Sequence, residues 1–332
     1  MSLKVLIVGG GSIGERHLRC FQQIGCEVAL CETNAQRRGE IATAYKLSQT
    51  YGSVDHAAAE QWDGVVICTP ADWHVDHATL LAPCAPALLI EKPLCTRLDD
   101  AGRLRDATKE NIVQVAYVLR AHPATERAKA LLAAGEIGPL HQITIVAGQH
   151  FPTFRPAYRE IYYARRASGG GAVQDAATHL FDTVQHLAGP FDWIFCDYAH
   201  QQLPGVEVED TVHFLGRAAE EKVMVSLALN QFMAPNETHV QLNGARGSIC
   251  IRFHEQRVGI LKFGDRDWAW SEPLVKERDD LFRAQAESFL AAAAGKQPPL
   301  CTLGEALHVL RVNLAALESG TRRVAVKIPH GE

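Results

Sequence analysis

The sequence lacks the features that mark several classes of protein. No block of lysine and arginine stands out, and the 332 residues carry a formal net charge of −5, so nothing favours a nucleic-acid or an anionic membrane partner. No apolar run is long enough to span a bilayer. No signal peptide is recognisable before the apolar run that begins at Leu3, and we find no internal repeat. We therefore expect a cytoplasmic protein with no nucleic-acid or membrane partner.

A cysteine framework is also missing. The chain has nine cysteines, an odd number, and no C-x-x-C pair. Several of them, such as Cys31 and Cys68, fall inside apolar runs. This usage predicts reduced thiols in a protein core and disfavours both a disulfide scaffold and a zinc site.

What is present is the composition of a globular protein, with 47% hydrophobic and 21% charged residues. The length fits two domains. Apolar runs alternate with helical spacing through the first third of the chain, which predicts a parallel sheet covered on both faces. The predicted strands span residues 3–9, 27–31, 64–69, 87–91 and 112–119.

The pattern changes after Pro123. From Trp193 to Trp270, short strands follow one another without long helices between them, and Val223, Val225 and later apolar residues alternate in the period of a pleated strand. This predicts a largely antiparallel sheet in an α+β domain. We expect a first domain with a parallel sheet over residues 1–121 and a second domain over 122–332. Further helices are predicted at 124–134, 172–187, 279–294 and 303–318, and a long strand at 140–150.

The first candidate site is the run Gly9-Gly10-Gly11-Ser12-Ile13-Gly14, which satisfies G-x-G-x-x-G. It follows a predicted strand and opens a predicted helix, which is the context of a dinucleotide-binding turn. Gly9 allows the tight turn, Gly11 allows close approach of a pyrophosphate, and Gly14 allows close packing of helix on strand. Ser12 and Ile13 complete the phosphate-binding turn. The alternative is a glycine-rich turn without a ligand.

Glu32 follows the second strand, 18 residues after Gly14. An acidic side chain there accepts hydrogen bonds from the adenosine ribose and repels a 2′-phosphate, so NAD is favoured over NADP. Arg37 and Arg38 come soon after and could bind that phosphate, so NADP stays open. The alternative role for Glu32 is a solvated loop charge.

Thr69 and Pro70 end the third major strand, where parallel sheets bind ligands, and we expect both to contact the cofactor, together with His74 in the next helix. The spacing of His74 and His77 could suggest a metal site. No other ligand cluster is tied to them by sequence, so we predict no metal. Asp72 is then expected to cap the helix N-terminus.

Glu91-Lys92-Pro93 ends the next strand, and Glu91 and Lys92 are further candidate cofactor contacts. Hydride transfer at a hydroxyl-bearing carbon also requires a proton to move on the oxygen. Desolvation and the positive nicotinamide would both lower the pKa of Lys92, which could then exchange that proton. The alternative is a surface lysine at a strand end.

A second constellation lies in the run Gly169 to Asp182. Asp175 and His179 are four residues apart, so they share one face of a helix. A carboxylate beside an imidazole fixes its tautomer and raises its basicity, which suits a general acid or base. An ordinary helical Asp–His pair is the alternative.

Taken together, these motifs resemble the glucose–fructose oxidoreductase / inositol 2-dehydrogenase (Gfo/Idh/MocA) family. The landmarks match in order over nearly the whole chain: the glycine turn at Gly9, Thr69-Pro70, Glu91-Lys92-Pro93 and the G-G-G-x-x-x-D-x-x-x-H run that ends at His179. The resemblance implies a Rossmann domain followed by a domain with a large open sheet, and a homodimer or homotetramer formed through that sheet. It implies Lys92 and His179 as the catalytic pair, with Asp175 orienting them and binding substrate hydroxyls.

Substrate specificity is expected in the tract from His150 to Arg166, which is rich in arginine and tyrosine. Arginine forms planar pairs with carboxylates and phosphates, and tyrosine stacks and hydrogen-bonds. An anionic or nucleotide-linked sugar would suit such a tract; a loop that packs against a neighbouring subunit is the alternative. The residues expected to bind substrate are Arg155, Tyr158, Arg159 and Tyr163, with Arg120 near the nicotinamide.

The sequence therefore predicts an NAD(H)-dependent oxidoreductase that acts on a sugar, polyol or sugar derivative. Two other functions stay open. One is an enzyme that retains NAD and cleaves a glycosidic bond by transient oxidation. The other is a non-catalytic NAD-binding sensor, which the intact Lys92, Asp175 and His179 disfavour.

Overall fold

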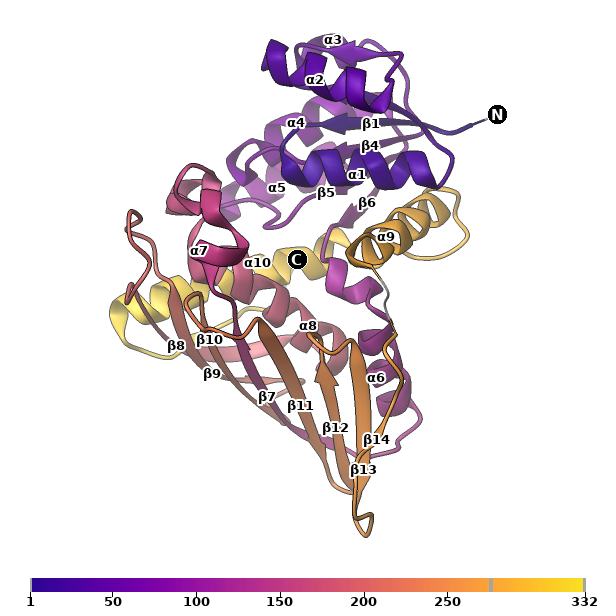
Figure 1. Cartoon of the computed structure of the whole chain (residues 1–332). Helices are drawn as coiled ribbons and strands as arrows, with labels where there is room; N and C mark the ends of the chain where they lie inside the picture. The colour runs from indigo at the N-terminus through magenta and orange to yellow at the C-terminus, as the bar shows by residue number, and fades with distance from the viewer. Residues whose placement is uncertain (1, 275–276, 331–332) are drawn as a thin grey trace. The chain divides into compact units, whose positions relative to one another are not determined.

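The computed structural model describes residues 2–274 and 277–330 (Figure 1). The chain divides into two compact units. The first runs to Ala121 and includes Glu277–Leu307, and the second begins at His122 and includes the chain from His308. The sequence-based division had assigned 277–307 to the second domain.

The first unit is built on a six-stranded parallel sheet in the order β3-β2-β1-β4-β5-β6. The central strands are continuous apolar runs that are buried along nearly their whole length, as expected for a sheet covered on both faces. The Rossmann prediction is therefore confirmed. The strands are β1 (Lys4–Val8), β2 (Glu27–Cys31), β3 (Thr50–Tyr51), β4 (Gly64–Ile67), β5 (Ala87–Ile90) and β6 (Ile112–Val115).

Helices connect these strands, and one more arrives from far along the chain. Helix α9 packs against α1, with the rings of Phe289 and Phe21 6.1 Å apart and an ion pair of 2.6 Å between Arg19 and Asp279. These contacts explain why α9 belongs to the first unit. The helices are α1 (Ser12–Gln23), α2 (Ala35–Tyr45), α3 (Val54–Ala57), η1 (Ala71–Trp73), α4 (His74–Leu81), η2 (Ala82–Cys84), α5 (Leu98–Ala107), η3 (Val118–Ala121), α9 (Arg278–Ala293) and the start of α10 (Leu303–Arg322).

The second unit is built on a nine-stranded sheet in the order β14-β13-β12-β11-β7-β10-β9-β8-β15. Among the described strands of this second sheet, only β7 and β10 pair in parallel, so the prediction of a mostly antiparallel sheet is confirmed. The strands are β7 (Leu140–Gly148), β8 (Phe191–Ala199), β9 (Thr211–Ala218), β10 (Val223–Asn230), β11 (Glu237–Gly244), β12 (Gly247–Arg252), β13 (Arg257–Lys262), β14 (Ala269–Trp270) and β15 (Val326–Lys327).

One face of this sheet is covered by helices, including α8, whose Phe181 packs 4.8 Å from Phe214 of β9. The opposite face is open: Met224 of β10 is 52% exposed between buried Val223 and Val225. The remaining helices are α6 (Pro123–Ala133), α7 (Phe151–Phe154), η4 (Pro156–Arg159), η5 (Tyr162–Ala164), η6 (Arg166–Ser168), the π-helical turn η7 (Ala172–Ala177) and α8 (Thr178–Ala188).

All nine cysteines are unpaired and eight are buried, which confirms the expectation of core thiols. Burial raises the pKa of Cys20 and of Cys31 to about 11. Across residues 2–274 and 277–330, no helix combines the length and apolar character that crossing a membrane requires.

Candidate functional site

The glycine turn joins β1 to α1 and has the geometry of a phosphate-binding loop. Gly9 has a φ of +95°, which only glycine adopts readily. A Cβ on Gly14 would lie 1.8 Å from the carbonyl oxygen of Gly9, whereas a Cβ on Gly11 would meet open space. Gly11 is the N-cap of α1 and offers no capping side chain, so the amide groups at this helix end suit an anion. The turn therefore fits the pyrophosphate of a dinucleotide.

Glu32 lies at the end of β2 against the same turn. Its Oε2 accepts a hydrogen bond of 2.7 Å from the Gly10 amide, and its Oε1 accepts one of 2.8 Å from Asn34. Arg37 and Arg38 donate to the backbone carbonyls of Gly10 and Glu32. The carboxylate is thus fixed beside the turn, where a ribose fits, and both arginines already have acceptors.

Thr69 and Pro70 follow β4 at the same edge of the sheet, and the side chain of His74 contacts the backbone of Thr69. The imidazole of His74 is fully buried. Its Nε2 lies 2.8 Å from the Thr69 carbonyl oxygen and its Nδ1 lies 3.1 Å from that of Pro93. Burial lowers the pKa of His74. This histidine therefore connects two loops at the sheet edge and exposes no surface of its own to a cofactor.

The neighbouring residues of α4 depart from the sequence-based expectation. Trp73 is the N-cap of α4 and no side chain caps it, so the prediction that Asp72 caps this helix is wrong. His77 stacks on Trp73 and its Nδ1 lies 3.1 Å from the hydroxyl of Thr69. His74 and His77 thus bind different oxygens of Thr69.

The Glu91-Lys92 pair follows β5 and is anchored by a residue that the sequence analysis missed. Nε2 of His17, in α1, lies 2.9 Å from Oε1 of Glu91, and the Oε2 of Glu91 accepts a hydrogen bond of 3.1 Å from the Lys92 amide. His17 is fully buried and Glu91 is 6% exposed. Lys92 therefore follows a buried carboxylate that is fixed by its contact with His17. The only sequence signal for His17 is a polar residue on the buried face of α1.

In the second unit, Asp175 is the centre of a charged cluster. It is 1% exposed, and its carboxylate accepts hydrogen bonds of 2.9 Å from Arg155 Nη1 and 2.5 Å from the Tyr162 hydroxyl. The neighbouring Asp175 raises the pKa of Arg155. Arg155 and Asp175, both predicted from sequence, are thus brought together, and Tyr162 is an addition that the prediction lacked.

The segment that carries Asp175 is not the plain α-helix that the sequence predicts from about residue 172. It is the π-helical turn η7, and α8 begins only at Thr178, with half-buried His179 in its first turn. π-helical turns are rare and recur at functional sites.

Two of the predicted substrate-binding tyrosines lie in the core. Tyr158 and Tyr163 are 1% and 0% exposed and pack with Phe151. The Tyr158 hydroxyl donates to the Pro204 carbonyl oxygen at 2.8 Å, and that of Tyr163 donates to Gln231. The structure therefore places both rings in the interior and not on a pocket wall, because the large aromatic side chains form a core of their own beneath the tract.

The two remaining arginines have different surroundings. Arg159 is exposed and donates to the Pro204 carbonyl oxygen at 2.8 Å. Arg120 is 1% exposed and pairs with Glu305 at 2.5 Å while donating to the Leu300 carbonyl oxygen at 2.8 Å. Arg120 therefore fixes the start of α10 within the first unit.

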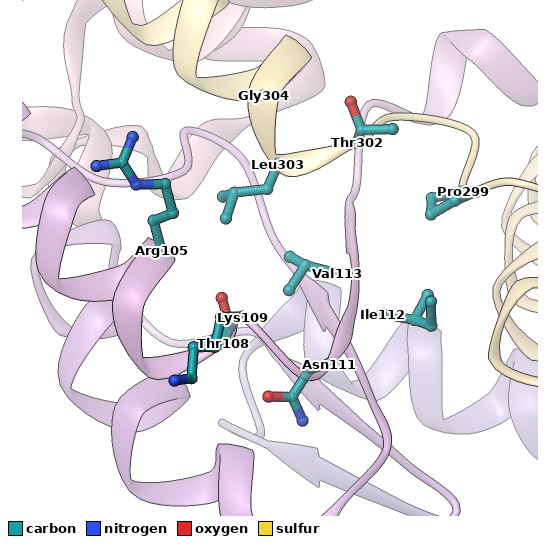
Figure 2. A pocket seen from close by; sticks show the side chains of 10 residues that line it. All are labelled: Arg105, Thr108, Lys109, Asn111, Ile112, Val113, Pro299, Thr302, Leu303 and Gly304. Carbon is teal, nitrogen blue, oxygen red and sulfur yellow. The ribbon is translucent and has the colours of Figure 1, made fainter. Parts of the chain in front are cut away.

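A pocket of about 340 Å³ lies elsewhere in the first unit (Figure 2). It is formed by the end of α5, the start of β6 and the first residues of α10, including Thr108, Ile112 and Leu303. The start of β6 marks the amino edge of the parallel sheet, whereas Gly9, Glu32, Thr69 and Glu91 follow the carboxyl ends of their strands. Ligands of such sheets bind at the carboxyl edge, so this pocket is separate from the dinucleotide site.

Comparison with known proteins agrees with this geometry. Residues 3–118 match the family model described as an oxidoreductase family with an NAD-binding Rossmann fold, and residues 125–250 match the GFO/IDH/MocA C-terminal domain. The molecule is thus an NAD-binding oxidoreductase. The chain belongs to the GFO/IDH/MocA family, which confirms the resemblance seen in its motifs.

Individual relatives extend over most of the chain. It is 33% identical to the uncharacterized oxidoreductase ORF334 of Rhizobium meliloti, covering 89% of each chain. It is 27% identical to inositol 2-dehydrogenase of Rhizobium meliloti (strain 1021), over 88% of this chain and 89% of that one. The fold is that of levoglucosan dehydrogenase in complex with NADH and levoglucosan, with a TM-score of 0.91 and 20% identity over 99% of this chain and 100% of that one.

Proposed function

We propose that this protein transfers a hydride between NAD(H) and a hydroxyl-bearing carbon of a sugar, polyol or sugar derivative. The family and the cofactor class support an oxidoreductase. Among the relatives, one is named inositol 2-dehydrogenase and another levoglucosan dehydrogenase, and both names refer to polyhydroxylated substrates.

In this proposal Lys92 and His179 manage the proton. NAD supplies the hydride acceptor when it is bound, and the alcohol oxygen must lose a proton as its carbon loses the hydride. Lys92 binds this oxygen, and His179 exchanges the proton, a role that imidazole side chains commonly take as general acid or base. Asp175 accepts hydrogen bonds from substrate hydroxyls.

The single observation that carries the proposal is the anchored position of Lys92. A surface lysine at a strand end needs no buried support, whereas here the preceding Glu91 is buried and bound by His17 at 2.9 Å, and His74 lies 3.1 Å from the carbonyl oxygen of the following Pro93. Reactive groups need this kind of preorganisation to within a fraction of an ångström.

The charged cluster in the second unit bears on the substrate class. Because Asp175 offsets the charge of Arg155 at 2.9 Å, this pair suits a neutral polyol, which both donates and accepts hydrogen bonds. Arg159 is exposed and would add affinity for a carboxylate or phosphate. An anionic or nucleotide-linked sugar would therefore depend on Arg159 more than on Arg155.

A homodimer or homotetramer through the C-terminal sheet is part of the same proposal. Val146, Leu215 and Met224 are 45%, 56% and 52% exposed on β7, β9 and β10, which are neighbouring strands. Exposed apolar patches on a sheet face suit association. Light scattering should give a multiple of the chain mass, and Leu215→Lys with Met224→Lys should lower it.

We also propose a cytoplasmic location. The nine cysteines are unpaired, and free thiols persist in a reducing compartment.

The experiment is a spectrophotometric screen for NADH formation with NAD or NADP against sugars, polyols and sugar acids. Release of NADH with one of these substrates supports the proposal. Cofactor that stays bound while a glycoside is cleaved would instead show the NAD-retaining reaction. NAD binding with no turnover on any substrate would indicate a sensor.

A further inference from the structure

A cluster of metal-ligating side chains lies in the second unit, on residues to which the proposed reaction gives no role. Glu237 and His239 are on the first residues of β11, and His254 is in the turn that follows β12. One ligand atom from each residue lies within 4.8 Å of the other two, and no second such group occurs within residues 2–274 and 277–330.

The strand geometry explains why these groups converge. Residues two apart on a strand point to the same face, so Glu237 and His239 project together. β11 and β12 are antiparallel neighbours, and His239 is opposite Arg252 in their register. The turn after Arg252 brings His254 back, so that its ring centroid lies 4.5 Å from that of His239.

The distances fit a divalent transition metal. Two ligands bound at about 2.0–2.1 Å in tetrahedral geometry are separated by about 3.3 Å. The Oε2 of Glu237 and the Nε2 of His239 are 3.2 Å apart, which already matches. All three ligand atoms lie within 4.8 Å of one another, which is at most about 1.5 Å beyond the tetrahedral value. Rotation of half-buried side chains at the strand end can close that gap.

His254 is held by the backbone of β11. The Thr238 amide donates a hydrogen bond of 3.3 Å to its Nδ1, and its Nε2 lies 3.6 Å from Oε1 of Glu255. A metal bound at Nε2 would shift the ring proton to Nδ1, which lies 3.4 Å from the carbonyl oxygen of Thr238 and would then donate to it. Ligating histidines commonly donate their other ring nitrogen to a backbone carbonyl in this way.

The nearest cation does not compete for the site. Arg252 is opposite His239, but its guanidinium donates to Glu255 at 2.9 Å and lies over the ring of Trp270 at 4.4 Å. Glu237 therefore supplies a negative charge next to two imidazoles. All three candidate ligands are half-buried in the single chain. His239 is opposite Val146 of β7, so an ion can reach the site from solvent when this face of the sheet is uncovered.

We propose that Glu237, His239 and His254 bind one divalent transition metal ion of the Zn²⁺ class, with water completing the coordination. Two imidazoles and one carboxylate are ligands that this class of ion accepts. The bound ion would connect β11 to the turn at residues 253–256. Phe253 of that turn packs edge-on against His122 at 5.0 Å, so the ion would also stabilise the turn against the first residue of this unit.

The test uses the full chain, stripped of metal by a chelator and titrated with Zn²⁺ in competition with a chromophoric chelator. We expect one equivalent to bind. His239→Gln and His254→Gln should each weaken the affinity by at least tenfold, and Glu237→Gln by a smaller factor, because the amide keeps an oxygen but loses the charge. His213→Gln is the matched control, because His213 is an exposed histidine of the same sheet, on β9, and it should bind Zn²⁺ like the parent.

X-ray absorption of the one-equivalent complex provides a second readout, and should show only nitrogen and oxygen ligands. Sulfur in the coordination shell, equal affinity in all four variants, or no bound equivalent would each overturn the proposal. A rise in the melting temperature on adding Zn²⁺, seen in the parent and in His213→Gln but not in His239→Gln, would support it.

Discussion

The contact between His17 and Glu91 allows a quantitative prediction of the free energy of unfolding. Both side chains are buried, and Nε2 of the imidazole lies 2.9 Å from the carboxylate. Hydrogen bonds to charged groups contribute about 1.5–3 kcal/mol, and a buried group left without its partner loses a similar amount. His17→Leu keeps an apolar contact with Phe282, whose ring is 5.5 Å from the imidazole, but leaves Oε1 of Glu91 without His17. We expect this substitution to lower the free energy of unfolding by about 2–3 kcal/mol.

A double-mutant cycle isolates the pair. Glu91→Leu alone should cost a similar amount, whereas the double variant should cost little more than either single one, because both polar groups are then gone. The coupling free energy from urea unfolding should be about 1.5–3 kcal/mol. If the costs of the two single variants add up to the cost of the double variant within about 0.5 kcal/mol, the two side chains are not energetically coupled.

The same variant tests what the pair does for Lys92. His17→Leu should lower kcat and leave the affinity for NAD nearly unchanged, because Glu91 binds the Lys92 amide at 3.1 Å. Thr108→Val is the matched control: its buried hydroxyl donates to Leu104 at 2.8 Å in α5 of the same unit, so the substitution should cost about 1 kcal/mol with no change in kcat. An equal loss of kcat in His17→Leu and Thr108→Val would show that His17 affects turnover only through the stability of the fold.

Three further predictions concern other groups. Tyr162→Phe removes the hydrogen bond of 2.5 Å to Asp175 and should lower kcat/KM by about tenfold or more. Tyr158→Phe changes a tyrosine in the core and should leave kcat/KM unchanged. The reverse pattern would contradict the placement of the two tyrosines. Glu32→Ala should weaken NAD binding and lower the ratio of NAD affinity to NADP affinity in fluorescence titrations. An unchanged ratio would show that Glu32 does not contact the ribose. Burial lowers the pKa of His122 to about 4. As the pH falls below about 6.5, His122 is therefore protonated in the unfolded chain before it is protonated in the folded one. The free energy of unfolding that depends on neutral His122 is complete above pH about 6.5 and decreases as the pH drops toward 4. His122→Asn, which keeps the cap on α6, should therefore reduce the stability lost between pH about 7 and 5 by about 2 kcal/mol, and an unchanged loss in urea titrations would refute this.

The fold of the first unit could be read from sequence to a large extent, because buried parallel strands are continuous apolar runs. The strand at 27–31 was predicted with the bounds that β2 has. The contribution of α9 to this unit could not be foreseen. Its packing on α1 depends on contacts such as Phe21 with Phe289, which join residues far apart in sequence and leave no local pattern.

The candidate site could be predicted where backbone geometry demands a residue type, as in the glycine turn. It could not be predicted where the role depends on tertiary contacts. The tract at 150–166 shows this: arginine and tyrosine suggest a polar pocket, yet Tyr158 and Tyr163 form a core and Tyr162, between them, binds Asp175. His17 is similar, because its partner Glu91 is 74 residues away and no spacing rule connects them.

We propose that Lys92 and His179 perform the proton step of an NAD-dependent hydride transfer. The most direct test compares the parent with Lys92→Met and His179→Asn, measuring both the rate of NADH formation on a substrate found in the screen and the dissociation constant for NAD. We expect turnover to fall by about 10²-fold or more in each variant while NAD binds as it does to the parent. Near-normal turnover in both variants would contradict it.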